Sequence, residues 1–183
     1  MVIDKTRTIA VIGGTGKLGA ALARRWAKAG LRVAIGSRDA DKAREAAAAL
    51  AAETGAAVDS GRNVDIAARA DLIVVSVPFA SQVATLEEIR AAAAGKLVVD
   101  TTVPLMPPKV MRVQLPPEGC AALRAQQTLG EAVRVVSAFH NVAAHKLATD
   151  EEIACDVLVF GDDKADRAQV VALADAAGLR GLH

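Results

Sequence analysis

Four glycines fall within seven residues near the start of the chain, where residues 13–19 read "GGTGKLG". From Gly14 onward this stretch fits the pattern G-x-G-x-x-G. It follows five residues that favour a strand and precedes an apolar, cationic helical segment. The free N–H groups and the positive dipole end at a helix N-terminus attract a diphosphate. We expect Gly14 to permit the tight turn, Gly16 to admit a pyrophosphate and Gly19 to let helix and strand pack closely, with Gly13 adding freedom. A turn that merely needs glycine is the alternative.

The end of the second expected strand carries cations where NAD-binding proteins usually carry an acid that accepts from the ribose 2′-hydroxyl. Residues 35–42 read "IGSRDADK", so Gly36 and Ser37 take the place of the acid, and Arg38 and Lys42 follow. A guanidinium binds a phosphate through charge-assisted hydrogen bonds worth about 1.5 to 3 kcal/mol each. This pattern predicts NADP(H) rather than NAD(H). In the alternative, Ser37 only caps the next helix and the cations are solvated.

Two further segments follow strands whose carboxyl ends would face the same ligand. In "SVPFA", Pro78 fixes the backbone, and Val77 and Phe79 offer an apolar face to a planar ring; equally, the proline could simply end a buried strand. In "DTTVP", the polar residues 100–102 either reach the cleft or cap the loop that follows.

His140, in "SAFHNVAAHKL", follows the sixth expected strand at the mouth of the cleft. It could contact a second ring system or move a proton near pH 7; equally, it could be a half-buried histidine satisfied by backbone. Asn141 is expected to cap the short helix that follows. His145 lies five positions further on, and no cysteine or acid completes a ligand set, so no metal site is predicted.

Few residues near the expected cleft could act as a general acid, because the chain has no tyrosine and no Ser-x-x-x-Lys or Tyr-x-x-x-Lys pair there. Hydride exchange between two cofactors needs alignment and exclusion of water more than a strong acid. The residues therefore favour that reaction class.

Composition excludes several partners. The net charge is +1 with scattered cations, and aromatic residues make up 2% of the chain, so neither a basic stripe nor stacking platforms for nucleic acid are expected. The apolar runs are too short to span a bilayer, and no membrane partner is predicted. Cys120 and Cys155 lack CxxC spacing, and no secretory segment precedes the first strand, which predicts a reducing cytoplasm. Both cysteines are expected to be small buried or half-buried side chains, and redox activity is the alternative.

Short β-branched runs alternate with Ala-rich helical stretches along the chain. This alternation predicts an α/β fold of the doubly wound Rossmann type, a mainly parallel sheet with helices on both faces. Strands are expected near Thr8–Ile12, Arg32–Ile35, Ala57–Asp59, Leu72–Ser76, Leu97–Asp100, Arg134–Ala138 and Val157–Phe160. Helices are expected near Lys17–Ala29, Asp39–Glu53, Val64–Arg69, Ser81–Ala93, Glu118–Leu129, Val142–Leu147 and Ala165–Ala176.

The 183 residues suit one domain, residues 1–183, with a single core. Residues 101–117 carry five prolines and no helical period, which predicts a long loop over the sheet edge. The terminal "LRGLH" starts like another strand that nothing completes.

Taken together, "GGTGKLG", "GSRDADK", "SVPF", "VVSAFHNVAA" and "VLVFGDD" resemble the NADPH-dependent F420 reductases, from about Thr8 to the end of the chain. The resemblance implies hydride transfer, in either direction, between nicotinamide C4 of NADP(H) and C5 of a deazaflavin (coenzyme F420) or a flavin-like acceptor, by a homodimer. It implies a 2′-phosphate site at Thr15, Ser37, Arg38 and Lys42, and a pyrophosphate site at Gly14, Gly16, Lys17 and Leu18. It places Val77 and Pro78 beside the nicotinamide, and His140 and Val142 near the deazaflavin.

Departures from the family pattern are also visible. Asp39 replaces a residue that is often basic, residues 141–144 lack a proline, and the strand and helix that continue past "GLR" in the family are not in the sequence. Two other functions stay open. One is a noncatalytic NADP(H)-binding module that senses redox state. The other is an NADPH-dependent reductase of a small carbonyl or imine, with His140 as its proton donor.

Overall fold

The computed structural model describes residues 3–106 and 112–183, and a six-stranded parallel sheet forms its centre. The strand order is β3-β2-β1-β4-β5-β8, which is the order of a doubly wound dinucleotide-binding sheet and confirms the predicted fold class. The bounds of β1 and β5 are those expected from the sequence, and β2 runs two residues further than expected. The strands are β1 (Thr8–Ile12), β2 (Arg32–Ser37), β3 (Val58–Arg62), β4 (Leu72–Val75), β5 (Leu97–Asp100) and β8 (Arg134–Ser137).

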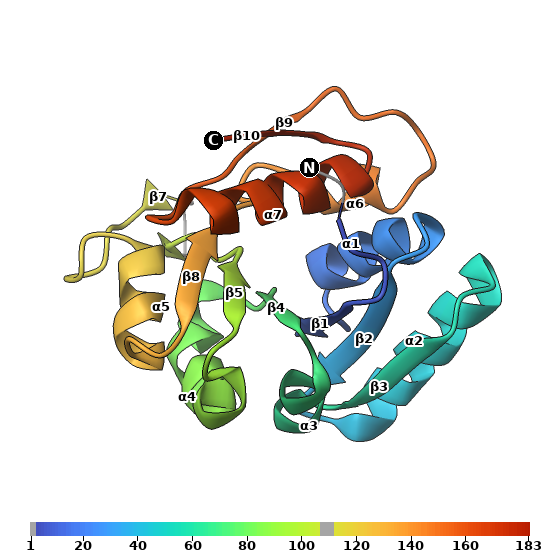
Figure 1. Ribbon diagram of the computed structural model, residues 1–183, viewed down its shortest axis with the longest axis horizontal. Helices are drawn as coiled ribbons and strands as arrows, with labels where there is room; N and C mark the ends of the chain where they lie inside the picture. Colours follow the sequence, from blue (N-terminus) through green and yellow to red (C-terminus); the bar gives the residue numbers. More distant parts are fainter. Residues whose placement is uncertain (1–2, 107–111) are drawn as a thin grey trace.

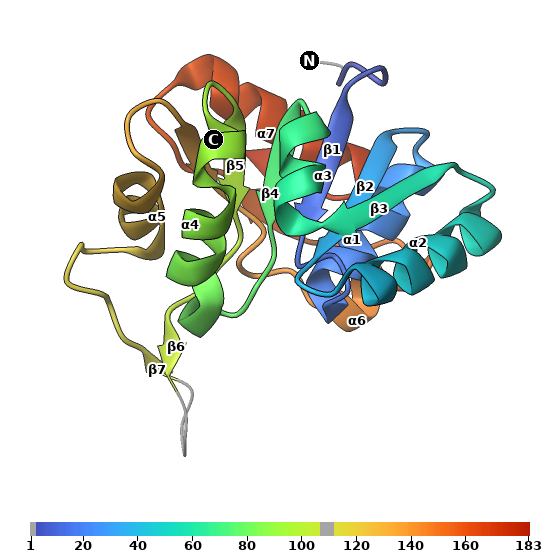
Figure 2. The same ribbon diagram turned by 90° about the horizontal axis from the view of Figure 1, so that it is seen from below.

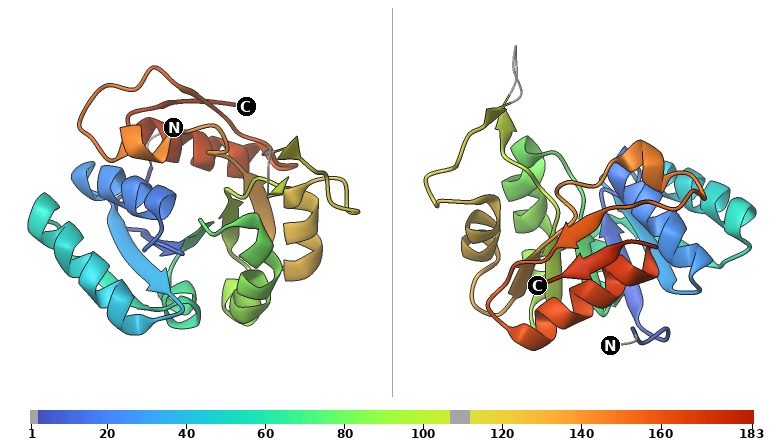
Figure 3. Two further views of the ribbon diagram at one scale, coloured as in Figure 1. Left: turned by 180° about the vertical axis from the view of Figure 1, so that it is seen from behind. Right: turned by 90° about the horizontal axis from the view of Figure 1, so that it is seen from above.

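Helices cover both faces of this sheet (Figures 1 and 3). Because side chains alternate along a strand, Val11 and Val74 enter the core on one face, and Ile12 and Val75 enter the core on the other. The first face is covered by α1 (Lys17–Lys28), α2 (Ala40–Thr54), α6 (Ala144–Leu147) and α7 (Lys164–Ala176). The second is covered by α3 (Asn63–Arg69), α4 (Gln82–Ala93), which follows the 3₁₀ turn η1 (Phe79–Ser81), and α5 (Ala121–Leu129).

The last two strands stand apart from the main sheet. β9 (Asp156–Leu158) and β10 (Arg180–Leu182) form a separate parallel pair alongside α7 (Figure 1). An isolated antiparallel bridge between Ser137 and Phe160 connects this segment to β8. The terminal strand therefore has a partner, contrary to the sequence-based expectation. Glycine at position 181 allows the close approach to α7, because a Cβ there would lie 2.8 Å from the Cα of Val171.

The proline-rich segment contains more regular structure than expected. A short antiparallel pair, β6 (Leu105–Met106) and β7 (Arg112–Val113), extends away from the sheet (Figure 2), and α5 begins three residues later than predicted. The part of the predicted loop at residues 107–111 lies outside the described residues. None of the helices that are described has both the length and the apolar character needed to cross a bilayer.

Candidate dinucleotide site

The parallel register brings the ends of four strands to one edge of the sheet. Ile12 of β1 aligns with Gly36 of β2 and with Val75 of β4, and Val75 aligns with Asp100 of β5. Two adjoining pockets open there, on either side of the switch point between β1 and β4, where such folds bind ligands. Gly16, Val77 and Pro78 line both pockets.

The first pocket, here called the β2-side pocket, has a volume of about 160 Å³. Of the predicted residues, it brings together Thr15, Gly16, Ser37, Arg38, Val77 and Pro78. The second, the β5-side pocket, has a volume of about 290 Å³ and gathers Gly16, Lys17, Leu18, Val77 and Pro78. Phe79, Thr101 and Thr102 also line it, as the sequence allowed. The other predicted residues line neither pocket: Gly14, Gly19, Lys42, His140 and Val142.

The roles of two glycines in the turn differ from those predicted. Gly13, rather than Gly14, has the left-handed backbone, with φ of +77°, and a Cβ there would lie 2.6 Å from the carbonyl oxygen of Ser76. Gly14 permits close packing, since its Cβ would meet the Val11 carbonyl oxygen at 2.8 Å. Gly19 has the predicted role, because a Cβ would approach the Gly13 carbonyl oxygen to 2.9 Å.

Gly16 is the N-cap of α1 and has no side chain to accept from the amides of the first turn. Those N–H groups have no acceptor within the helix and can donate to anionic oxygens. Gly16 lines both pockets, so this donor set lies where they meet. The local structure therefore fits a diphosphate.

The segment after β2 places one cation at the pocket. Asp39 caps α2 by accepting from the backbone N–H groups of Asp41 and Lys42, at 3.0 and 3.3 Å. Ser37 is buried and accepts from the Asp39 N–H at 3.2 Å, so Ser37 is not the N-cap that the alternative interpretation supposed. Arg38 is exposed and lines the β2-side pocket. Lys42 is exposed in the first turn of α2.

A buried polar network lies behind the β5-side pocket. Asp100 accepts from the Gln82 amide at 2.8 Å and from the Thr102 hydroxyl at 2.9 Å. Burial raises the pKa of Asp100 to about 6, although hydrogen bonds from Thr102 and Gln82 oppose the rise. Arg124 extends the network by donating from Nε to Gln82 Oε1 at 2.7 Å and from Nη2 to the Phe79 carbonyl at 2.9 Å. Sequence reasoning missed Gln82 and Arg124, because helix positions give no sign of which way their side chains point.

His140 is half-buried, and its Nε2 lies 2.8 Å from the Ser137 hydroxyl oxygen, so its partner is a side chain rather than backbone. Burial lowers the pKa of His140. The preceding Phe139 is the sole non-glycine residue with positive φ in the described ranges, at +65°; it packs edge-on against Trp26 with centroids 6.0 Å apart. Val142 is buried in the core.

Asn141 does not cap the short helix. It donates to the Asp156 carbonyl at 3.0 Å, and Ala143 is the N-cap of α6. Asn141 therefore contacts β9, and the sequence pattern did not predict this contact.

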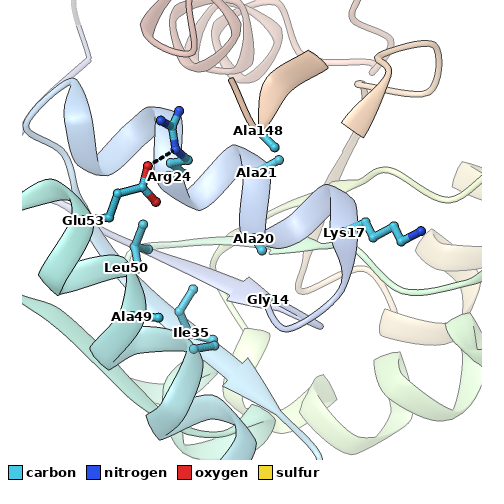
Figure 4. Close-up of a pocket in the computed structure, with 11 residues that line it drawn as sticks. Gly14, Lys17, Ala20, Ala21, Arg24, Ile35, Ala49, Leu50, Glu53 and Ala148 are labelled. Atoms are coloured by element: carbon cyan, nitrogen blue, oxygen red, sulfur yellow. Dashed lines mark hydrogen bonds and ion pairs between the residues drawn. The ribbon is translucent and has the colours of Figure 1, made fainter. Parts of the chain in front are cut away.

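A larger groove of about 350 Å³ lies between α1 and α2 (Figure 4). Five of its eleven lining residues are alanine, and Arg24 and Glu53 in its wall form an ion pair with each other. Lys17, which also borders the groove, is directed away from it in Figure 4. The two smaller pockets, rather than this groove, bring together most of the residues that the sequence singled out. Across residues 3–106 and 112–183, no cluster of three His, Cys, Asp or Glu side chains is arranged to hold a metal ion.

The chain is similar to known proteins over most of its length. Residues 8–104 match the family model described as "NADP oxidoreductase coenzyme F420-dependent". The F420-dependent NADP reductase of Methanothermobacter thermautotrophicus is 42% identical over 164 residues, which cover 85% of this chain and 71% of that protein. The enzyme of the same name from Methanocaldococcus jannaschii is 36% identical over 176 residues, covering 91% and 78%. A crystal structure from Arthrobacter sp. FB24, assigned as an F420-dependent NADP-reductase, has a TM-score of 0.77 and 29% identity, covering 95% of this chain and 83% of the other.

Proposed function

Because the chain belongs to the family of coenzyme F420-dependent NADP oxidoreductases, we propose that it transfers a hydride between NADP(H) and coenzyme F420. One observation carries the proposal: a cation-bearing pocket after β2 adjoins a pocket lined by apolar groups and threonines after β4 and β5, with the free amides of α1 between them. Along an NADP(H) molecule, the 2′-phosphate, the pyrophosphate and the nicotinamide follow one another in the same order as the cation-bearing pocket, the free amides and the apolar pocket.

In this proposal, Thr15, Ser37 and Arg38 bind the 2′-phosphate, and the amides around Gly16 bind the pyrophosphate. Lys42 would add its charge after a change of rotamer. Val77, Pro78 and Phe79 border the nicotinamide, which supplies the hydride chemistry when NADP(H) is bound. The apolar wall excludes water from the ring, and no proton transfer by the protein is required at this step.

His140 and Val142 are proposed to lie toward the deazaflavin. We further propose a homodimer, supported by the exposed apolar side chains of Leu158 and Phe160, which are 51% and 57% exposed at the β9 segment. A cytoplasmic location is proposed as well; the free, half-buried thiols of Cys120 and Cys155 are compatible with a reducing compartment.

The proposal is tested by mixing the protein with NADPH and oxidised F420 and following the visible absorbance of the deazaflavin. We expect F420 to bleach, with FMN and FAD as comparison acceptors. No change with any of the three would favour a noncatalytic NADP(H)-binding module.

Replacing His140 separates this reaction from reduction of a small carbonyl or imine. Since burial lowers its pKa, His140 is mainly neutral at pH 7 and is a poor proton donor. His140→Ala should therefore only weaken turnover. The exposed His145 on α6 provides a matched control, and His145→Ala should have no effect. Abolished turnover in His140→Ala alone would favour the carbonyl or imine reductase.

A further inference from the structure

Asn63, the first residue of α3, has a buried acceptor without a partner. Its side chain lines the β2-side pocket, and the residue is 2% exposed. The amide nitrogen donates to Glu88 Oε2 at 3.1 Å, whereas the amide oxygen, Oδ1, meets no donor in the described part of the chain. Buried polar atoms in folded proteins are nearly always paired, so this oxygen points to a donor that the chain itself does not supply.

Glu88 fixes which end of the amide faces the pocket. An ionised carboxylate only accepts hydrogen bonds, so the Asn63 nitrogen must face Glu88. The oxygen is then held on the opposite side, near the end of β2, where a Cβ built on Gly36 would lie 3.1 Å from it. Glycine at position 36 leaves the space that this oxygen occupies.

The required donor is not a phosphate. Arg38 and the hydroxyls of Thr15 and Ser37 in the same pocket can donate to an anion, whereas a carbonyl oxygen would repel one. The end of β2 is also where NAD-binding proteins place the carboxylate that accepts from the ribose hydroxyls. Asn63 brings an acceptor to that place from the neighbouring element and adds no negative charge beside the 2′-phosphate.

We propose that Asn63 Oδ1 accepts a hydrogen bond from the 3′-hydroxyl of the adenosine ribose of NADP(H). This assignment rests on the proposed function, because it needs NADP(H) in the β2-side pocket. The 2′-oxygen of that ribose carries the phosphate, so the 3′-hydroxyl is the donor that remains on the ring. Asn63 is thereby a cofactor-binding residue that recognises the sugar, while Ser37 and Arg38 recognise the phosphate.

The test is a calorimetric cycle with two ligands, adenosine 2′,5′-bisphosphate and its 3′-deoxy analogue, and two proteins, wild type and Asn63→Ala. Loss of one hydrogen bond predicts that the wild type binds the deoxy analogue about 3- to 10-fold more weakly. Asn63→Ala should bind both ligands alike, at the level of the wild type with the deoxy analogue. Asn141→Ala, which changes the other asparagine of the chain, should behave as wild type.

Equal affinity of the wild type for the two ligands would overturn the assignment, and this measurement needs no variant to fold. Discrimination that persists unchanged in Asn63→Ala would overturn it as well. If the wild type binds adenosine 2′,5′-bisphosphate and Arg38→Ala weakens that binding, the proposed cofactor stands even when the Asn63 assignment falls. No binding of this ligand or of NADP⁺ would overturn both.

Discussion

The guanidinium of Arg124 lies over the ring of Phe79, with its central carbon 3.6 Å from the ring centroid. The same guanidinium donates to the Phe79 carbonyl and to Gln82, and Gln82 in turn donates to Asp100 and Thr102. One set of contacts thus runs from α5 through α4 to the segments after β4 and β5. Phe79 and Thr102, which line the β5-side pocket, are held at opposite ends of this set.

Arg124→Ala should weaken NADPH binding at the nicotinamide end. The loss of a cation–π contact and of the bond to the Phe79 carbonyl predicts an increase of about 5- to 10-fold in the KM for NADPH. Adenosine 2′,5′-bisphosphate is proposed to occupy the β2-side pocket alone, so its inhibition constant should not change. Arg124→Lys should restore little of the NADPH affinity, because an ammonium group cannot stack on the ring of Phe79 and also donate both hydrogen bonds of the planar guanidinium. Equal weakening of both ligands would show a general loss of structure instead.

Arg38→Ala should shift coenzyme preference. Removal of charge-assisted hydrogen bonds to the 2′-phosphate predicts a KM for NADPH raised by about 10- to 100-fold, with a much smaller change for NADH. Steady-state kinetics with both coenzymes give the comparison. Arg44→Ala is the matched control, since Arg44 lies on α2 and pairs with Asp41 away from both pockets. Equal effects of Arg38→Ala on NADPH and NADH would contradict NADP(H) specificity.

Gly13→Ala and Gly55→Ala separate backbone strain from steric clash. Both glycines have a left-handed backbone, with φ of +77° and +71°, so alanine costs each about 1 kcal/mol of conformational strain. At Gly55 the added Cβ meets nothing within 4 Å, whereas at Gly13 it meets the Ser76 carbonyl. Urea unfolding should show Gly13→Ala less stable than Gly55→Ala by about 1 to 3 kcal/mol. Similar losses would mean that the turn relaxes without cost.

The buried Asp100 predicts a pH-dependent free energy of unfolding. Its pKa is about 6 in the folded protein against an ordinary value of 3.8, so between these values the folded state holds the proton more tightly. Stability should therefore fall as the pH rises from about 4 to 6 and be constant above, by on the order of 3 kcal/mol in total. Subtracting the unfolding curve of Asp100→Asn isolates this contribution. Parallel profiles of the two proteins would contradict it.

Most of the central sheet could be predicted from the sequence, because buried parallel strands are short apolar runs between amphipathic helices. Thr8–Ile12 and Leu97–Asp100 show this, with bounds that agree to the residue. The pairing of β9 with β10 could not be predicted from the sequence. It depends on the packing of Gly181 against Val171, which is a contact between elements rather than a local pattern.

Some residues of the candidate site could also be predicted from the sequence, and others could not. Residues at or just after the ends of strands, such as Ser37 and Val77, could be predicted to line one pocket because the sheet places the strand ends together. Asn63 also directly follows a strand, and that position was the available signal for it. Gln82 and Arg124 act through side-chain directions that only the packing of α4 against α5 determines.

The space above Gly36 also limits how coenzyme preference can evolve. A carboxylate introduced at this position, the usual route to NADH, would bring a Cβ to within 2.9 Å of Ile12 Cδ1 and 3.1 Å of Asn63 Oδ1. Ile12 Cδ1 is the end of a flexible side chain and can move aside, whereas the Asn63 amide, which is held by Glu88, must shift by a few tenths of an ångström. A carboxylate at position 36 would therefore disturb the acceptor at Asn63 while it supplies a new one.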